Sequence, residues 1–462
     1  MKLQAYPCIK PSGVEWLGDV PEHWAAQGVK FCYTIQLGKM LQPEPASPTD
    51  EETPYLKSQH VQWEHVRVAD LPTMWTNKKE RRQYAVKDGD LLVCEGGDVG
   101  RAAVVRGAPD GTIIQNALHR VRPQGENETG FLLYVLAHAA SQGWFEIICN
   151  KSTIAHFTVD KFGALGVALP TPAEQRAIAA FLDRETGRVD RLVEKKRELI
   201  ERLKEKRTAL ISRTVTRGLP PAAARAAGLP ANPALKSSGH PWLDDIPKHW
   251  EVKRLKEVSV LFGRIGFRGY STDDLVYEGE GAISMSPSNM ADGVVSLDKC
   301  TWLSWEKYYE SPEIQVQPED VIMVKTGSTL GKTAFVRSVP VPMTVNPQLM
   351  IFKEVKCSKR FLFYYVFSKI VQDVIPLHNT GSTIPTMTQE GIGKLPFPHP
   401  PLPEQAAIAA YLDVETAYLD ALVGKVEEAV KRLQEYRTAL ITAAVTGKID
   451  VRERTNTKDR KR

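Results

Sequence analysis

The chain has 462 residues, 42% of them hydrophobic, and a formal net charge of +5 at pH 7. That length is enough for two to four domains with real cores. There is no apolar stretch long enough to span a bilayer, and Met1 to Lys10 lacks the build of a signal peptide. The six cysteines form no CxxC pair, which is typical of reduced thiols. We therefore expect a cytoplasmic protein, and the mild charge leaves nucleic-acid binding open.

An internal repeat is the most informative feature of the sequence. Near the start, SGVEWL (12–17) precedes VPEHW (20–24), and in the middle SGHPWL (238–243) precedes IPKHW (246–250). Two tryptophans at matched spacing, with a proline and a histidine between them, indicate a duplication. Because the period is about half the chain, the repeat predicts two domain-sized copies and not a solenoid.

The repeat is closest in two later segments. Glu-Gln-x-x-Ile-Ala-x-[Phe/Tyr]-Leu-Asp occurs at 174–183 and 404–413, and Arg-Thr-Ala-Leu-Ile occurs at 207–211 and 437–441. A shorter match joins Ser-Thr-Ile at 152–154 to the same tripeptide at 382–384. The shared parts look architectural, whereas the bodies between them differ. A freely drifting old duplication is the alternative explanation.

The bodies have the pattern of mixed α/β domains. Short apolar runs behind an aspartate, at 90–94 and 320–324, predict buried strands, and glycines after them predict turns. The segments 131–140 and 361–374 predict packed helices.

The closely repeated segments have a helical pattern. Thr171, Pro172 and Glu174 resemble a capping box, which predicts a short helix to about Asp183, broken near Thr186-Gly187. A second helix of roughly 28 residues, about 42 Å long, should then end before a glycine. The apolar stripes of the two copies include Leu192, Leu199, Leu203, Leu210, Leu422, Val426, Leu433 and Leu440.

An exposed apolar stripe needs a partner, and the economical partner is the other copy. If the duplication creates two-fold symmetry, the helices pack as an antiparallel coiled coil. Bodies held about 40 Å apart would then face successive major-groove segments, since one DNA turn is about 34–36 Å. The alternative is that each helix packs only on its own body.

Taken together, these motifs resemble the specificity subunits of Type I restriction-modification systems. The resemblance covers essentially the whole chain, because Gly-x-x-Trp-Leu with Pro-x-His-Trp, the Glu-Gln segment and Arg-Thr-Ala-Leu-Ile all occur twice in order. It implies two tandem α/β target-recognition domains, separated by two long helices in an antiparallel, pseudo-two-fold coiled coil. It also implies that each domain reads one half of a split, asymmetric DNA site. Modification (methyltransferase) subunits, two by expectation, would dock on the helices, and restriction subunits would join them.

The expected domain boundaries follow the repeat. They are a first target-recognition domain (1–172), a first helical spacer (173–217), an Ala/Pro-rich linker (218–237), a second target-recognition domain (238–402), a second helical spacer (403–447) and a basic tail (448–462).

DNA contacts call for Arg or Lys at phosphates and guanine edges, and for Asn or Gln at adenine edges. Residues of these types on expected loops are Lys57, Gln59, His60, Arg101, Asn116, Lys325, Ser328, Lys332, Asn346 and Gln348. Each of them alone can equally be a structural polar residue. The match between Asn116 and Asn346 favours a structural role if the two half-sites differ.

Three patterns look catalytic but are incomplete. The segment 327–333 resembles a phosphate-binding loop with one residue too few between its glycines. Asp320 with Glu354 and Lys356 resembles a loose nuclease cluster, and the first copy has no such triplet. No Asn-Pro-Pro-aromatic tetrapeptide for methylation of a flipped adenine is present. We therefore expect no catalytic residue, no metal and no cofactor in this chain.

Two other functions stay open from the sequence alone. One is a self-sufficient DNA methyltransferase or endonuclease on a duplicated scaffold, which would need a catalytic motif. The other is a coiled-coil adaptor without sequence-specific DNA binding.

Overall fold

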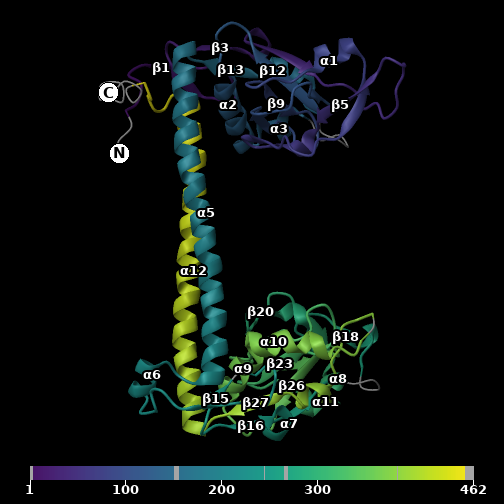
Figure 1. The fold of residues 1–462 in the computed structure, drawn as a ribbon, viewed down its shortest axis with the longest axis vertical. Helices are drawn as coiled ribbons and strands as arrows, with labels where there is room; N and C mark the ends of the chain where they lie inside the picture. Colours follow the sequence, from purple (N-terminus) through teal and green to yellow (C-terminus); the bar gives the residue numbers. More distant parts are fainter. Residues whose placement is uncertain (1–3, 150–155, 244, 265–268, 382, 453–462) are drawn as a thin grey trace. The chain divides into compact units, whose positions relative to one another are not determined.

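The computed structural model describes residues 4–149, 156–243, 245–264, 269–381 and 383–452 (Figure 1). The chain forms two compact units. The first unit combines residues 1–197 with 428–462, and the second unit contains residues 198–427. The Ser-Thr-Ile tripeptide at 152–154, Ser382 and the basic residues after Arg452 lie outside the described residues.

The body of the first unit is a set of small sheets with short helices against them. Its strands are β1 (Ile9–Pro11), β2 (Asp19–Pro21), β3 (Ala25–Gly28), β4 (Tyr33–Leu37), β5 (Glu51–Leu56), β6 (Val61–Gln62), β7 (His65–Val66), β8 (Thr73–Thr76), β9 (Leu91–Cys94), β10 (Ala102–Val104), β11 (Ile113–Ile114), β12 (Leu118–Pro123) and β13 (Gly166–Leu169). Its short helices are η1 (Val29–Phe31), η2 (Ser58–His60), α1 (Lys78–Tyr84), α2 (Thr129–Ser141), α3 (Trp144–Ile148) and α4 (Val159–Ala164).

The body of the second unit has a similar set of elements. Its strands are β14 (Leu235–Lys236), β15 (Ile246–Pro247), β16 (Glu251–Arg254), β17 (Val260–Phe262), β18 (Leu275–Val276), β19 (Ala282–Met285), β20 (Met290–Ala291), β21 (Val294–Val295), β22 (Thr301–Leu303), β23 (Val321–Val324), β24 (Thr333–Phe335), β25 (Met343–Val345), β26 (Leu349–Lys353) and β27 (Pro396–His399). Its short helices are α6 (Pro221–Ala226), α7 (Leu255–Val258), η4 (Thr272–Asp274), η5 (Pro287–Asn289), α8 (Trp305–Tyr309), η6 (Pro312–Ile314), α9 (Lys359–Phe367), α10 (Lys369–Val374), η7 (Ile375–His378) and α11 (Gln389–Gly393).

The two bodies share one strand topology. In the first unit the main sheet has the order β10-β9-β12-β4, and in the second unit the matching strands have the order β24-β23-β26-β17. A smaller sheet pairs β5 with β11 in parallel and with β8 antiparallel. Its counterpart pairs β19 with β25 in parallel and with β22 antiparallel. The duplication predicted from the flanking motifs therefore extends through the divergent bodies.

The predicted buried strands are confirmed. Every residue of β9 and of β23 is buried, and each strand lies inside its main sheet. The helix predicted for 131–140 is confirmed as α2. The single helix predicted for 361–374 is wrong, because Ser368 adopts an extended ψ of 150° and separates α9 from α10. Its hydroxyl donates to Tyr365 O, so the serine competes with the helical hydrogen bonds.

Two long helices, α5 (Pro172–Arg217) and α12 (Leu402–Val445), carry the closely repeated segments. They have 46 and 44 residues, so the predicted length of roughly 28 was too short. The predicted break near Thr186-Gly187 is also wrong. Thr186 is buried and its hydroxyl donates to Leu182 O, so tertiary packing outweighs the about 1 kcal/mol that Gly187 costs in a helix.

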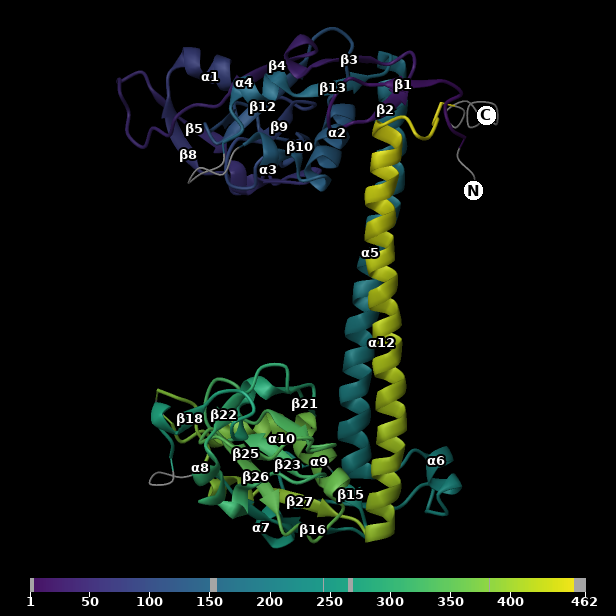
Figure 2. The same ribbon diagram turned by 180° about the vertical axis from the view of Figure 1, so that it is seen from behind.

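Within each unit the two helices lie side by side and run antiparallel (Figures 1 and 2). In the second unit Arg207 Nε lies 2.9 Å from Asp420 Oδ1, and in the first unit Arg437 Nε lies 2.9 Å from Asp190 Oδ1. A shift of 230 residues converts one pair into the other, since 207 + 230 = 437 and 190 + 230 = 420. The repeat therefore exchanges the partners, as pseudo-two-fold packing requires.

The seam between the helices differs in part from the predicted stripe. On α5, Val189, Val193 and Ile200 are buried, whereas Leu192 and Leu199 are each 43% exposed. The expectation that these two leucines pack in the seam is wrong, because a helix buries a stripe of limited width and they lie beside it. The other predicted positions are partly buried, except Leu440, which is buried: Leu203, Leu210, Leu422, Val426 and Leu433.

The imidazole of His138 packs between α12 and the body of the first unit. His138 is 4% exposed, its Nδ1 lies 3.1 Å from Thr442 Oγ1, and its ring centroid lies 5.5 Å from that of Trp16. Burial, helped by the charge of Lys448, lowers the pKa of His138 from 6.5 to about 4. The ring is therefore neutral at physiological pH.

We expect this histidine to make the first unit less stable in acid. Because folding lowers the pKa of His138, protonation of this ring favours the unfolded state. The free energy of unfolding is therefore unaffected by the ring above pH 6.5 and decreases as the pH falls toward 4. The loss is up to about 1.4 kcal/mol of unfolding free energy per pH unit. Urea unfolding of the wild type and of His138→Asn across this range measures it. If the unfolding free energies of the wild type and of the variant changed equally with pH, His138 would not be the source of the acid sensitivity.

Candidate nucleic-acid interface

The repeated motifs form a joint between each body and its long helix. In the first unit the buried Glu174 accepts hydrogen bonds from Tyr6, from His23 Nε2 at 3.0 Å and from Trp24 Nε1 at 3.4 Å. Gln175 accepts from Glu128 N at 2.9 Å and donates to Pro170 O at 3.0 Å. The Pro-x-His-Trp and Glu-Gln motifs are thus partners of each other.

The second joint repeats this arrangement. His249 Nε2 lies 2.8 Å from Glu404 Oε2, and Gln405 accepts from Ser358 N and donates to Pro400 O, both at 2.8 Å. Trp24 and Trp250 are fully buried, so these two tryptophans are core residues, whereas Trp16 and Trp242 are partly buried. Trp250 Nε1 is buried without a hydrogen-bond partner among the described residues.

The cation after each glycine turn fastens that turn to a neighbouring 3-10 turn. Arg101 donates to Ser58 O in η2 at 3.0 Å and pairs with Asp98 at 3.0 Å. Lys332 Nζ donates to Pro287 O in η5 at 3.2 Å. Both predicted DNA-binding cations therefore also connect the glycine turn to the 3-10 turn of their unit, and we call these two turns the loop scaffold.

The other candidates of the first unit lie on or near η2. Gln59 is exposed, whereas Lys57 is half-buried and caps the turn, its N–H donating to His60 Nδ1 at 3.1 Å. His60 is 2% exposed, and burial lowers its pKa. Asn116 is half-buried, and its N–H donates to Lys39 O at 2.9 Å. Of these four, the structure leaves Gln59 the most accessible.

The candidates of the second unit divide in the same way. Ser328 and Gln348 are exposed. Asn346 is buried, accepting from Gln348 N at 3.0 Å and donating to its side chain at 3.3 Å. Lys325 Nζ donates to Arg264 O at 3.3 Å, and burial lowers its pKa. Asn346 positions Gln348, which agrees with the structural role favoured by the Asn116 match.

The phosphate-loop resemblance at 327–333 has no support in the geometry. Lys332 donates to a backbone carbonyl, and the buried Thr333 donates to Gly331 O at 2.8 Å. The Thr333 hydroxyl that would bind the metal of a nucleotide is thus engaged within the protein.

The nuclease resemblance is explained by a buried ion pair. Asp320 is 2% exposed and lies 2.6 Å from Lys353 Nζ, while Glu354 is exposed on a turn with a φ of 47°. The first unit repeats the pair with Asp90 and Arg122, whose Nε lies 2.6 Å from Asp90 Oδ1. Among the described residues no cluster of His, Cys, Asp and Glu could hold a metal ion.

A contrast between two matched helices was missed in the sequence. α1 follows β8 and presents Lys78, Lys79 and Arg82 to solvent, whereas α8 follows β22 and presents Trp305 and Tyr309. The run KKERR was visible in the sequence, but only the matched strand order identifies it with WEKYY.

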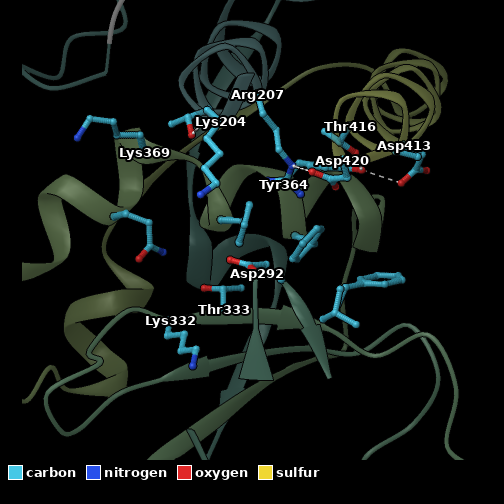
Figure 3. A pocket seen from close by; sticks show the side chains of 18 of the residues that line it. Lys204, Arg207, Asp292, Lys332, Thr333, Tyr364, Lys369, Asp413, Thr416 and Asp420 are labelled. Atoms are coloured by element: carbon cyan, nitrogen blue, oxygen red, sulfur yellow. Dashed lines mark hydrogen bonds and ion pairs between the residues drawn. The ribbon is translucent and has the colours of Figure 1, made fainter. Parts of the chain in front are cut away.

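A large cavity lies between the helix pair and the body of the second unit, with a volume of about 1150 Å³ (Figure 3). Arg207 reaches from α5 to Asp420, and its guanidinium lies 5.5 Å from the ring centroid of Phe367. In the first unit the matching Arg437 forms an ion pair with Glu64 of the body. Glu64 lies in the turn between β6 and β7, at the position that Gly293 occupies between β20 and β21 in the second unit. The arginine is common to both joints, whereas its partner in the body differs.

The model of the Type I restriction modification DNA specificity domain matches residues 52–202 and 247–432. The chain belongs to this family. It is a specificity subunit, a DNA-recognition component and not itself the catalyst. Self-sufficient catalysis and a simple adaptor role therefore find no support. The structure contains no helix, within the residues it describes, that could cross a membrane.

Relatives in the family are similar to this chain over two thirds or more of their length. The MjaVIII specificity subunit of Methanocaldococcus jannaschii is 22% identical over 94% of each chain, and the EcoDI specificity subunit of Escherichia coli is 21% identical over 67% of this chain and 68% of its own. A chain from a solved structure of the assembly and conformational transition of the type I R-M system has a TM-score of 0.70 at 17% identity, covering 93% of this chain and 99% of its own. The HsdS subunit from Thermoanaerobacter tengcongensis has a TM-score of 0.54 at 17% identity, covering 93% and 98%. These matches agree with the fold of two α/β bodies and two long helices.

Proposed function

We propose that each unit of this specificity subunit reads one half of a split, asymmetric DNA site. The reading surface is the glycine turn after the central strand, together with the adjacent 3-10 turn. One observation carries this proposal. The two units build the same scaffold, with Arg101 bound to η2 and Lys332 bound to η5, but they display different exposed side chains on it. Recognition of two different half-sites requires the same loop scaffold with different base-contacting side chains.

The predicted contact residues take different roles within this proposal. Gln59 and Gln348 are exposed amides suited to adenine edges, and Ser328 is an exposed hydroxyl for either base type. The half-buried cations are suited to phosphates beside the scaffold: Lys57, Arg101, Lys325 and Lys332. The buried or half-buried members shape the loops: His60, Asn116 and Asn346.

We propose that two modification subunits dock on the long helices, that restriction subunits join them, and that the assembly works in the cytoplasm. The exposed Leu192 and Leu199 support docking, because they lie seven residues apart on the same face of α5 and offer apolar contacts to a partner. The pseudo-two-fold exchange of the Arg–Asp pairs supports two partners, since symmetric surfaces offer two equivalent sites.

Methylated adenines mapped by long-read sequencing test the proposal. Cells with the presumed modification subunit are compared with and without this gene, and we expect a split motif with a fixed gap only when the gene is present. Replacing residues 238–402, our proposed second domain, with those of another family member should change one half of the motif and preserve the other. Replacing residues 1–172 should change the opposite half.

A methylation pattern that is the same with and without the gene would contradict sequence reading and favour an adaptor role. A swap of 238–402 that alters both halves would contradict the assignment of one half-site to each unit. Western blots for the modification subunit in each strain distinguish these results from failed expression.

A further inference from the structure

The joint between the helices and the body is filled in the first unit but hollow in the second. In the first unit the imidazole of His138 lies between the ring of Trp16 and Thr442 Oγ1. This ring closes the space between α2, α12 and the opening motif.

The repeat identifies the matching positions in the second unit. Trp16 matches Trp242 in the opening motif, and a shift of 230 takes Thr442 back to Ser212 and His138 forward to Ser368. The same shift relates Tyr134 to Tyr364, which donate to Asp183 at 2.7 Å and to Asp413 at 2.8 Å, so the register is secure.

The second unit has no imidazole at this place. Ser368 has a short side chain, and its hydroxyl donates to Tyr365 O at 2.7 Å. α9 ends at Phe367, so the chain turns away where α2 continues. The walls of the site remain while the ring is missing.

A cavity of about 750 Å³ lies beside two of the three matching positions and next to Ser368 in the chain, at Lys369 and Ile370. Trp242 and Ser212 both line it, together with Thr208, Ala209 and Ile370. Ser212 Oγ is buried and has no hydrogen-bond partner among the described residues, whereas Thr442 Oγ1 has the imidazole. A buried polar atom without a partner is rare. Because Ser212 Oγ has almost no accessible surface, its side chain must rotate toward the cavity before a ligand can accept or donate a hydrogen bond there.

We propose that this cavity binds a planar nitrogen heterocycle, which stacks against Trp242 and hydrogen-bonds with Ser212 Oγ. The volume lies within the about 300–1,000 Å³ of small-molecule sites, so rings up to the size of a purine fit. The charged groups that line the cavity are of both signs, which favours a neutral ring: Glu201, Lys204, Glu205, Lys369 and Asp373.

The test uses the full chain with its nine tryptophans labelled with ¹⁵N. Trp242→Phe and Trp16→Phe identify the two indole N–H signals. Imidazole and adenine are titrated separately at a pH of about 8, where imidazole is neutral. We expect the Trp242 signal to shift with saturation. The Trp16 signal should not respond, because its site is already filled.

Two variants of the cavity sharpen the test. Ser212→Ala should weaken binding about fivefold, the effect of one neutral hydrogen bond. Ala209→Trp, at an exposed helix position that lines the cavity, should block the site and abolish the shift. The proposal is overturned if the Trp242 signal does not saturate with either probe, or if both variants bind as the wild type does.

The first unit supplies a matched control. His138→Gly should open the corresponding cavity and make the Trp16 signal respond to imidazole, while the Trp242 response is unchanged. A Trp16 signal that responds equally in the wild type and the variant would show that the shift reflects tryptophan exposure alone, and would overturn the proposal.

Discussion

Glu174→Leu is expected to lower the unfolding free energy of the first unit by about 3–5 kcal/mol. Glu174 is 3% exposed and accepts hydrogen bonds from Tyr6, His23 and Trp24. The variant leaves these donors without an acceptor in or near the core, and each buried donor left unsatisfied costs about 1–3 kcal/mol. Urea unfolding followed by tryptophan fluorescence measures the loss.

Glu404→Leu in the second unit is the matched control. Glu404 accepts from His249, while Trp250 Nε1 lacks a hydrogen-bond partner among the described residues. Fewer donors lose their acceptor, so we expect a smaller loss than for Glu174→Leu. Equal losses would contradict the view that the number of bound donors sets the strength of each joint.

Asp90→Ala is expected to destabilise the first unit by about 3 kcal/mol. Asp90 is 4% exposed, accepts from Arg122 Nε at 2.6 Å and from Lys87 N at 2.8 Å, and its loss leaves a partly buried guanidinium unpaired. Removing one partner of a buried ion pair costs about 3–5 kcal/mol, and the partial exposure of Arg122 favours the lower end. Thermal and chemical unfolding measure the change.

The double variant Asp90→Leu/Arg122→Met tests whether the loss of stability in Asp90→Ala comes from the unpaired charge of Arg122. It removes both charges, so we expect it to recover most of the lost stability. Asp320→Ala should behave as Asp90→Ala does, because Lys353 Nζ lies 2.6 Å from Asp320. If instead Asp320→Ala left stability unchanged but abolished binding of a divalent cation, the structural interpretation of this aspartate would be wrong.

The candidate DNA-contact residues were only partly predictable. Residue type placed Arg101 and Lys332 among them, and both lie on matched loops, but each also binds a 3-10 turn that is more than 40 residues earlier in the chain. That turn is distant in sequence, so no local pattern reveals the contact. The exposure of Gln59 and Gln348 likewise depends on the packing of separate loops.

The sequence by itself determined the duplication, the α/β class, the buried central strands and the family, because these depend on local hydrophobic patterns and on motifs that occur twice. Tertiary structure decided which residues those motifs bind. Glu174 meets His23 and Trp24 only when the chain folds back over some 150 residues. It also decided that α5 continues through Thr186-Gly187 and that Val193, not Leu192, faces the seam. Helix propensity and periodicity are weak local preferences of about 1 kcal/mol or less per residue, so the packing of distant segments outweighs them.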